Sequence, residues 1–249
     1  MSEAAKSAPV VLVTGGARRV GAAIVRELHR EGCAIALHHR RSRAEAEALA
    51  AELETPGSPP VALFAADLAD PGACQRLAEA VIERFGRLDG LVNSASAFFP
   101  TPVKELTAAD FDHLMAVNAR APLMLTLAAA PALARASGAV VNIGDVFGIK
   151  PLPKFLAYSA SKAALLMITQ ALARELAPAV RVNAILPGTV LPSELPEKAE
   201  SAEIVAARAP LARLGTPVEV AAAVRFLLFE ASYTTGALLP VDGGRLLRT

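Results

Sequence analysis

Two residues have the types and the spacing that proton transfer requires. Tyr158 and Lys162 stand four residues apart in Tyr158-Ser-Ala-Ser-Lys162, where a long stretch with helical spacing begins. This spacing puts both side chains on one face of a helix. A cation near a phenol favours the phenolate and lowers the pKa of the tyrosine, which then serves as a proton donor and acceptor near neutral pH. The alternative is a surface Tyr–Lys pair that stabilises the helix by roughly a few tenths of a kcal/mol.

A glycine-rich segment, Thr14-Gly-Gly-Ala-Arg-Arg-Val-Gly21, joins the first predicted strand to the first predicted helix. Glycines let a backbone approach a phosphate closely, and a helix N-terminus supplies free N–H groups and a positive dipole end. Arg18 and Arg19 add two cations, which oppose the dipole unless an anion binds there. The segment therefore predicts a nucleotide phosphate site formed by Gly15, Arg18, Arg19 and Gly21. An ordinary tight turn is the alternative.

A second candidate anion site follows the second predicted strand, in His38-His-Arg-Arg-Ser42. NAD-binding sites usually have an acidic residue here for the ribose 2′-OH, whereas this sequence has Arg40 and Arg41. Guanidinium groups beside a helix start favour a 2′-phosphate, and therefore NADP(H). Ser42 would belong to this site or simply cap the following helix. Asp67, after the third predicted strand, would accept a hydrogen bond from the adenine amino group or be an ordinary turn residue.

Alternating strands and helices must position these motifs. The predicted strands are Val10–Thr14, Ala34–His38, Val61–Ala65, Leu88–Asn93, Ala139–Ile143, Val180–Leu186 and Ala237–Val241. Nearly continuous apolar strands are typical of a parallel sheet that is buried on both faces. The sequence predicts an α/β fold over residues 1–249: a single Rossmann-type, doubly wound domain with helices on both faces and right-handed crossovers. Ligands bind at the carboxyl ends of such strands, where the motifs fall.

Local signals indicate where helices begin and end. Ser42-Arg-Ala-Glu45 and Thr216-Pro-Val-Glu219 have the spacing of capping boxes. Asp70-Pro71 predicts the start of another helix, and Gly86 predicts its end.

Composition limits the class of protein. The chain has 249 residues, with 25 basic and 24 acidic side chains and a net charge of +1, unlike a nucleic-acid binder. Cys33, Cys74 and the histidines have no metal-ligand spacing, so we interpret His29, His38, His39 and His113 as hydrogen-bonded structural residues. The start lacks a signal-peptide stretch, and Ala121–Ala134 is shorter than the roughly 20 residues of a membrane span, which predicts a buried helix. We expect a cytoplasmic protein without a metal, nucleic-acid or membrane partner.

The motifs together resemble the short-chain dehydrogenase/reductase superfamily over essentially the whole chain. The matching residues are, in order, Thr14–Gly21, Asn93-Ser-Ala-Ser96, Asn118, Tyr158 with Lys162, Pro187-Gly188 and Val241-Asp-Gly-Gly244. The resemblance implies that Tyr158 is the catalytic acid/base and that Lys162 holds the nicotinamide ribose and lowers the pKa of Tyr158. It also implies that Asn118 organises a proton-relay water, that Asn93 steadies the sheet beside the cofactor, and that the cofactor site includes Asn93, Pro187 and Gly188.

Two residues depart from the common pattern of the superfamily. Arg19 stands where the usual turn has its middle Gly, and Asp145 stands where the usual catalytic Ser lies, 13 residues before the Tyr. A Ser would donate a hydrogen bond to a substrate carbonyl, which a carboxylate cannot do unless it is protonated. An ionised Asp suits a substrate rich in N–H donors. A ring nitrogen that receives a proton through water or a protonated carboxyl is the other chemistry that fits.

Both departures resemble the pteridine reductase branch, which includes the bacterial dihydromonapterin reductases. The similarity extends to His38–Ser42 and to Asn93–Pro102. It implies that Arg19 reaches the phosphate and pterin region, that Ser96 contacts cofactor or substrate, and that Phe98 sandwiches the pterin against the nicotinamide. A flat heteroaromatic ring gains from such stacking. Without the resemblance, Phe98 and Phe99 would be core or loop-anchoring aromatics, and the role of Phe99 stays open.

The sequence therefore predicts an NADPH-dependent reductase of a pterin-type substrate. Tyr158, Lys162 and Asp145 would manage the proton, while Arg19 and Phe98 position the ring. One alternative is a carbonyl reductase in which Asp145 simply replaces Ser. Another is a non-catalytic, NADP-binding regulatory protein.

Assembly and substrate coverage are further expectations. The resemblance implies a homotetramer that packs through its long central helices. Phe111–Ala134 and Ala163–Leu176 would provide that face, unless both are buried in the core. The segment 187–203 would cover the substrate, but its sequence does not reveal a substrate preference.

Overall fold

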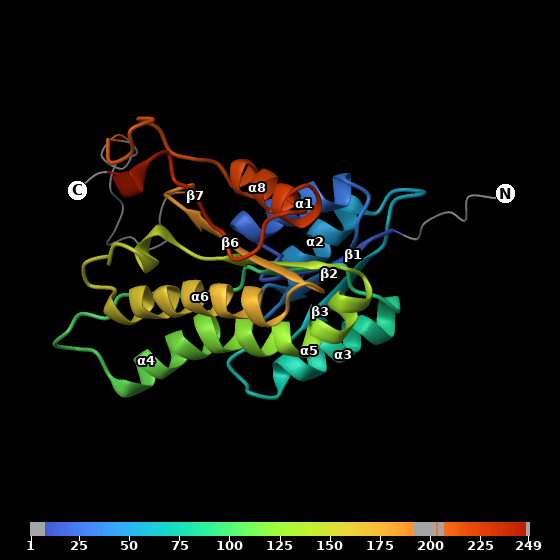
Figure 1. Ribbon diagram of the computed structural model, residues 1–249, viewed down its shortest axis with the longest axis horizontal. Helices are drawn as coiled ribbons and strands as arrows, with labels where there is room; N and C mark the ends of the chain where they lie inside the picture. The colour runs from blue at the N-terminus through green and yellow to red at the C-terminus, as the bar shows by residue number, and fades with distance from the viewer. Residues whose placement is uncertain (1–7, 192–202, 204–206, 248–249) are drawn as a thin grey trace.

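The computed structural model describes residues 8–191, 203 and 207–247 and builds one parallel sheet from their strands (Figure 1). The strand order is β3-β2-β1-β4-β5-β6-β7. The strands are β1 (Val10–Thr14), β2 (Ala34–His39), β3 (Val61–Ala65), β4 (Gly90–Asn93), β5 (Ala139–Ile143), β6 (Arg181–Pro187) and β7 (Leu238–Val241). The predicted doubly wound, Rossmann-type architecture is confirmed.

Helices cover both faces of the sheet (Figure 1). One face carries α1 (Arg19–Arg30), α2 (Arg43–Leu53) and α8 (Pro217–Phe229). The other carries α3 (Ala73–Phe85), α4 (Ala108–Met115), α5 (Ala121–Arg135) and α6 (Leu156–Glu175). Alternation along each strand divides the core, since Val11 and Val13 pack toward α1 and α8 while Val10 and Leu12 pack toward α3 and α5.

The predicted strands agree with the structure apart from their ends. Three of them match residue for residue, namely β1, β3 and β5. The largest difference is at β4, which was predicted from Leu88 but begins at Gly90. Asp89 explains the delay, because its carboxylate accepts hydrogen bonds from the Val10 backbone N–H (2.8 Å) and from Arg87. Val10 therefore bonds to Asp89 twice, through its N–H to the side chain and through its carbonyl oxygen to the Asp89 backbone N–H (2.8 Å), before the regular ladder starts.

The helix-end signals have mixed outcomes. Thr216 and Glu219 form the predicted capping box, and Gly86 ends α3 with a φ of 74°. The capping box predicted at Ser42 is wrong: Ser42 has φ −84° and ψ 55°, not the extended conformation of an N-cap, and its side chain makes no capping bond. Glu45 instead pairs with Arg18 at 3.9 Å. The helix predicted from Asp70-Pro71 begins later, at Ala73, because Asp70 first closes a turn onto the Gly72 N–H (3.0 Å).

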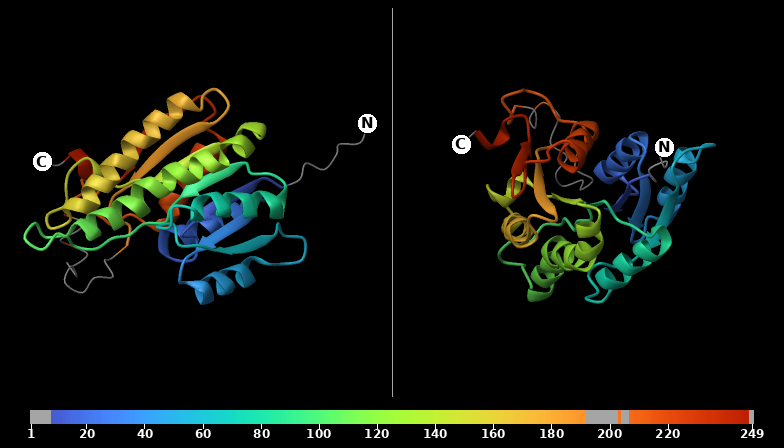
Figure 2. Two further views of the ribbon diagram at one scale, coloured as in Figure 1. Left: turned by 90° about the horizontal axis from the view of Figure 1, so that it is seen from below. Right: turned by 45° about the vertical axis from the view of Figure 1, so that its right-hand side comes forward.

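The apolar segment that forms α4 and α5 is buried on one side, where it packs into the core, and exposed on the opposite side. By length and composition Ala108–Arg135 is a candidate membrane span, but 56% of its most apolar window is buried inside the molecule. Leu125 and Leu133 are fully buried, whereas Met124 and Leu127 are exposed. The prediction of a buried helix at Ala121–Ala134 is therefore confirmed for the sheet-facing side and wrong for the outer side. Figure 2 shows α6 running beside this layer.

Candidate active site

The motif residues gather at the carboxyl ends of β1, β4 and β5. In register, Thr14 of β1 lies beside Asn93 of β4, which lies beside Asn142 of β5. The sheet order runs outward in opposite directions from β1 and β4, which makes this edge the topological switch point of the fold. Thr14 Oγ1 ties the two strand ends together by accepting hydrogen bonds from the backbone N–H groups of Ser94 (2.9 Å) and Ala95 (3.0 Å).

Two glycines of the turn after β1 are required by close backbone contacts. Gly15 has a φ of 63°, and a Cβ there would lie 2.9 Å from the Cα of Ala95. A Cβ at Gly21 would lie 2.1 Å from the carbonyl oxygen of Gly15. A side chain at either position would displace backbone. The N-terminus of α1 therefore packs directly onto the turn, as a phosphate-binding helix start requires.

The predicted cations surround this turn. Arg18 and Arg19 are exposed at the start of α1, and Arg40 and Arg41 are exposed where β2 ends. Arg19 adopts a φ of 51°, a left-handed conformation that costs an ordinary L-residue roughly 1–2 kcal/mol. A glycine would adopt this conformation without that steric cost, so the arginine stands here against a local penalty.

His38 connects this turn to the next loop of the site. Its Nδ1 accepts a hydrogen bond from the Gly15 backbone N–H (3.1 Å), so its Nε2 carries the proton and donates to the Ala66 carbonyl (3.1 Å). Burial lowers the pKa of His38 to about 4, which keeps the ring neutral. The neighbouring Asp67 is exposed, and its Oδ1 accepts from the Ala69 N–H (3.0 Å), as in a turn. The interpretation of His38 as a hydrogen-bonded structural residue is confirmed.

The other histidines lie apart from the turn. His29 Nε2 is 2.9 Å from the Pro59 carbonyl oxygen, and the His113 ring stacks on Phe99 at 6.1 Å. For His39 the expectation of satisfied hydrogen bonding is wrong, since Nδ1 has no partner in the described part of the chain. Because β2 is buried along its whole length, this ring is also shielded from solvent. Within the described residues, no three His, Cys, Asp or Glu side chains group as metal ligands.

Asn118 holds the loop that follows β4. It lies in a π-helical turn, η1 (Ala116–Arg120), and is buried. Its Oδ1 accepts from the Ala97 N–H (2.8 Å) and from Ser96 Oγ (3.1 Å), and its Nδ2 donates to the Ala97 carbonyl (2.9 Å) and Ser161 Oγ (3.0 Å). One amide thus fixes both polar groups of the Ala97 backbone and joins this loop to α6.

Asn93 belongs to a buried polar network within the sheet. Its Nδ2 donates to Asn142 Oδ1 (2.8 Å), and Asn142 Nδ2 in turn donates to Thr169 Oγ1 on α6 (2.9 Å). Thr126 of α5 lies 3.4 Å from the same Asn93 nitrogen. The side chain of Asn93 therefore fixes the strand ends against two helices, in keeping with the steadying role that the resemblance implied.

Tyr158, Asp145 and Lys162 converge where β5 ends and α6 begins. The Tyr158 hydroxyl donates to Asp145 Oδ2 at 2.6 Å, and the Phe147 N–H donates to Asp145 Oδ1 at 2.9 Å. The Lys162 ammonium donates to the Ile143 carbonyl at 2.9 Å and lies 5.8 Å from the centre of the Tyr158 ring. The i, i+4 geometry of Tyr158 and Lys162 is confirmed.

The prediction that Lys162 lowers the pKa of Tyr158 is wrong for the protein chain without a cofactor. Burial and the negative charge of Asp145 raise the pKa of Tyr158 well above its usual value. Burial also lowers the pKa of Lys162 to about 8. Burial raises the pKa of Asp145, partly opposed by its hydrogen bond from Tyr158. At a given pH, a larger share of the Asp145 carboxyl is therefore protonated than of an ordinary aspartate.

An aromatic group forms one wall beside Tyr158. Phe98 is 40% exposed, stacks on the buried Phe155 at 4.6 Å and meets Tyr158 edge to face at 4.7 Å. Phe155 fixes the orientation of a ring that remains available to a ligand. Phe99 is partly buried and packs into the cluster of Leu114 and Phe155, so its position is that of a loop anchor.

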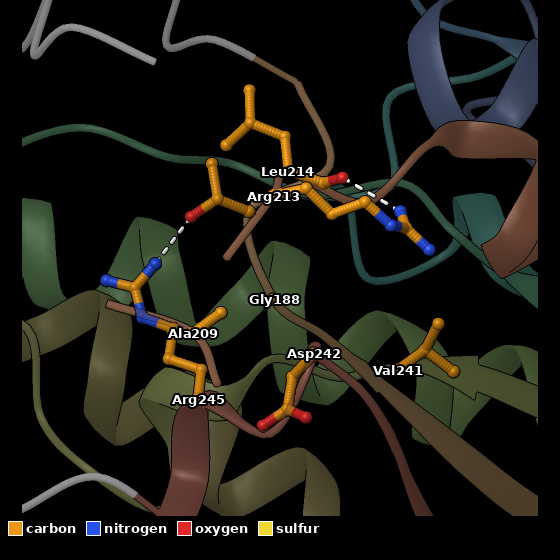
Figure 3. Close-up of a pocket in the computed structure, with 9 residues that line it drawn as sticks. Gly188, Ala209, Arg213, Leu214, Val241, Asp242 and Arg245 are labelled. Carbon is orange, nitrogen blue, oxygen red and sulfur yellow. Dashed lines mark hydrogen bonds between the residues drawn. The ribbon is translucent and has the colours of Figure 1, made fainter. Parts of the chain in front are cut away.

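Residues after β6 and β7 complete this edge (Figure 3). A Cβ at Gly188 would lie 2.8 Å from the Cα of Asp242, which joins the Pro187-Gly188 and Val241–Gly244 motifs into one unit. The unit lines a small pocket together with Arg213 and Arg245. Of the predicted covering segment 187–203, positions 192–202 lie outside the described residues.

Sequence reasoning missed several partners of these residues. Phe155, Asn142, Ser161 and Arg245 were not singled out, although Ser161 lies inside the Tyr158–Lys162 motif. Three of the four pair with elements distant in the sequence: Asn142 with β4 and α6, Ser161 with η1, and Arg245 with the end of β6. Phe155 could have been found from its place three residues before Tyr158, where an aromatic packs against the same face.

Comparison with known proteins gives consistent matches over nearly the whole chain. Residues 15–245 match the family model described as enoyl-(acyl carrier protein) reductase. Pteridine reductase 1 of Leishmania tarentolae is 36% identical, with 96% of each chain covered. The 3-oxoacyl-(acyl-carrier-protein) reductase of Synechocystis sp. is 33% identical, covering 98% of this chain and 99% of the relative.

Solved structures agree with these relatives. A blue fluorescent protein from a metagenomic library, in complex with NADPH, has a TM-score of 0.88 and 36% identity, covering 95% of this chain and 97% of that chain. A short-chain dehydrogenase/reductase of Serratia marcescens has a TM-score of 0.88 and 35% identity, covering 96% and 98%.

Proposed function

Since the chain belongs to the short-chain dehydrogenase/reductase superfamily of oxidoreductases, we propose that it reduces a pterin-type ring with NADPH. One observation carries this proposal: a buried carboxyl, Asp145, is hydrogen-bonded to Tyr158 at 2.6 Å beside the partly exposed ring of Phe98. A carboxyl and a phenol together can deliver a proton to a ring nitrogen, and the aromatic face suits a flat heterocycle.

The cofactor would lie across the switch point, and the residues there fit NADP(H). Gly15 and Gly21 let the turn after β1 pack closely onto the start of α1, whose free N–H groups would face a phosphate, and Arg40 and Arg41 would supply cations for a 2′-phosphate. When bound, NADPH supplies a hydride for the reduction. The remaining proposed contacts are Arg18, Arg19, Ser42, Asp67, Asn93, Ser96, Lys162, Pro187 and Gly188.

The chain's own residues would manage the accompanying proton. As the carbon of a C=N bond gains the hydride, the nitrogen gains the bond's electron pair and takes the proton of the Tyr158 hydroxyl. The Asp145 carboxyl then returns a proton to the Tyr158 oxygen through their hydrogen bond. Burial raises the pKa of Asp145, which keeps a larger share of this carboxyl protonated. Activity should therefore be lost as the pH rises through the pKa of Asp145.

Three further residues would position the substrate. Phe98 would stack on the pterin ring, held by Phe155 behind it. Arg19 would reach the substrate and a phosphate from its strained position. Ser96, fixed by Asn118, would contact cofactor or substrate. Asn118 would also organise a proton-relay water.

A carbonyl reductase is the second candidate, favoured by the similarity to the 3-oxoacyl-(acyl-carrier-protein) reductase. Asp145 favours this candidate less than a Ser would, because a carboxyl donates a hydrogen bond to a ketone oxygen only while it is protonated. A non-catalytic NADP-binding protein is the third candidate, and the paired Tyr158 and Lys162 argue against it.

A crystal soaked with NADPH and an antifolate that mimics a pterin tests the proposal. We expect ring density between the nicotinamide and Phe98, with a polar edge facing Asp145. Density for NADPH alone, with the antifolate absent at saturating concentration, would contradict the pterin assignment.

We also propose that the protein is a cytoplasmic homotetramer of one cofactor-binding domain per chain. Exposed apolar side chains on α5 and α6, namely Met124, Leu127 and Met167, support a shared helix face. Light scattering measures the assembly, and a protein that is monomeric at all concentrations would contradict the tetramer.

A further inference from the structure

The end of the chain brings a cation to the Asp145 side of the candidate site. Arg245 is the first residue of a short helical turn, η4 (Arg245–Leu247), that follows β7. Its guanidinium carbon lies 5.0 Å from the centre of the Phe147 ring, within cation–π range. Its Nη1 also donates a hydrogen bond to Thr189 Oγ1 after β6, as Figure 3 shows. Arg245 therefore joins three segments that are distant in the sequence.

The turn that carries Arg245 is firmly held. The Asp242 carboxylate accepts from the Gly244 N–H (2.8 Å) and from the Leu246 N–H (2.8 Å). Gly244 has a φ of 84°, and a Cβ there would lie 2.9 Å from Pro210 Cγ. The Leu246 side chain packs against the buried Val146 cluster. Because the backbone of both neighbours, Gly244 and Leu246, is held by hydrogen bonds, the backbone of Arg245 is held in place between them.

Phe147 contacts both Arg245 and Asp145. Phe147 lies in the short helical turn η2 (Val146–Gly148), and its backbone N–H donates to Asp145 Oδ1 at 2.9 Å. The ring on which Arg245 lies and the N–H that holds Asp145 thus belong to one residue. Arg245 restrains the Phe147 side chain, and any displacement of the Phe147 backbone would lengthen the hydrogen bond to the carboxylate and weaken it.

We propose that Arg245 is a positioning residue for Asp145, which it fixes through Phe147 and stabilises in its ionised form by its positive charge. This inference rests on the proposed function, because it assigns regulation to the same proton-carrying carboxyl. Arg245 would set the pH range in which the proton relay works and would not itself touch the transferred hydride or proton.

The charges around Asp145 support this role. The groups facing the carboxyl are the Tyr158 hydroxyl and the Lys162 ammonium from α6, the Phe147 N–H from η2 and the Arg245 guanidinium from η4. The positive charges of Lys162 and Arg245 lower the pKa of Asp145, against the rise caused by burial. Lys162 would itself bind the cofactor, whereas Arg245 is not among the proposed cofactor contacts, although it lines one pocket with Gly188.

The chain offers a matched control on the same pocket. Arg213 also lines it, but Arg213 forms a two-point ion pair with Glu219 (2.6 and 3.1 Å). Removing Arg213 takes away a cation of the same kind from the same neighbourhood. It breaks no contact with Phe147 or Thr189 that the described residues show.

The test compares Arg245→Met, Arg245→Gln, Arg245→Lys and Arg213→Met with the wild-type chain. Carboxyl ¹³C NMR of aspartate-labelled protein, with the Asp145 signal assigned by Asp145→Asn, gives the titration midpoint without any assay of activity. We expect the midpoint to move to higher pH in Arg245→Met and Arg245→Gln, and to stay near the wild-type value in Arg245→Lys and Arg213→Met. The pH at which pterin reduction is lost should move in the same direction. At a pH well below both midpoints, where Asp145 is protonated in either protein, kcat/KM should fall by about two- to fivefold in Arg245→Met, because one exposed cation–π contact that positions Asp145 is lost.

The Asp145 midpoint and the pterin activity test two separate claims, the role of Arg245 and the proposed function. An unchanged Asp145 midpoint in folded Arg245→Met and Arg245→Gln, or an equal shift in Arg213→Met, would overturn the role of Arg245. If Arg245→Met does not fold, Arg245→Gln, which keeps hydrogen-bond donors but no charge, decides the matter. A shifted midpoint in a protein that reduces no pterin would support the role of Arg245 and overturn the proposed function.

Discussion

The Tyr158 hydroxyl lies 2.6 Å from Asp145 Oδ2, so the phenol and the carboxyl share one short hydrogen bond. These two groups titrate as a coupled pair, and changing one changes the proton affinity of the other. The proposed proton transfers all involve Tyr158 or Asp145.

Tyr158→Phe should abolish most of the reduction while leaving cofactor binding intact. Loss of a positioned proton donor costs about 10²- to 10⁴-fold in rate, and kcat for the pterin should fall within that range. Tyr233 is the matched control, since it is the only other tyrosine in the sequence and is fully exposed. Nicotinamide fluorescence on binding measures cofactor affinity. A large loss in Tyr233→Phe, or none in Tyr158→Phe, would contradict the role of Tyr158.

Asp145→Asn should lower the pKa of Tyr158. The Asp145 charge and its hydrogen bond both raise the pKa of Tyr158, and the amide removes the charge. The sequence has two tyrosines and no tryptophan, so phenolate absorbance follows both titrations with little background. Subtracting the Tyr158→Phe titration isolates the step that belongs to Tyr158. A step that stays in place or moves to higher pH in Asp145→Asn would show that Asp145 does not control the phenol.

Arg41→Ala should weaken the binding of NADPH selectively. A hydrogen bond to a charged group contributes about 1.5–3 kcal/mol, so KM for NADPH should rise by about ten- to a hundredfold while KM for NADH barely changes. Arg43→Ala is the control, because Arg43 is exposed two residues later and donates to Glu47 at 2.7 Å. Equal effects on both cofactors, or equal effects of the two variants, would argue against a 2′-phosphate contact at Arg41.

Phe98→Ala should raise KM for the pterin by about two- to tenfold, because ring stacking contributes about 0.5–1.5 kcal/mol beyond area burial. Phe99→Ala should reduce thermal stability without changing this KM, since Phe99 packs into the Leu114 cluster. Steady-state kinetics and thermal melting separate the two effects. The stacking role would be refuted by an equal KM for Phe98→Ala and the wild type.

The sheet could be predicted from sequence because each strand carries its own signal. Val10–Thr14 and Ala139–Ile143 are short apolar runs whose burial on both faces leaves few alternatives. The same holds for the Thr216 capping box, which is complete within four residues. Ser42 has the same spacing, yet its box does not form: its backbone is not extended, and Glu45 pairs with Arg18 from the turn before α1. Local patterns fail where a tertiary contact competes for one of the partners.

The candidate site could be predicted as a set of residues, but not as an electrostatic system. Tyr158 and Lys162 lie as expected, whereas the expected fall in the pKa of Tyr158 does not occur. Asp145 approaches the phenol from the end of β5 and adds a negative charge that the i, i+4 spacing does not reveal. Likewise, nothing near Gly15 in sequence indicates that its N–H is accepted by His38, 23 residues later. Contacts between elements decide both features.

Initial rates of NADPH oxidation with a dihydropterin and with a simple ketone, in the wild type and in Asp145→Ser, test the central claim most directly. We expect the wild type to consume NADPH with dihydrobiopterin or dihydromonapterin, and Asp145→Ser to lose pterin activity. A rise in ketone activity in Asp145→Ser is the result expected of a carbonyl reductase instead. Wild-type turnover of ketones without turnover of any pterin would contradict the proposal that the enzyme reduces a pterin-type ring.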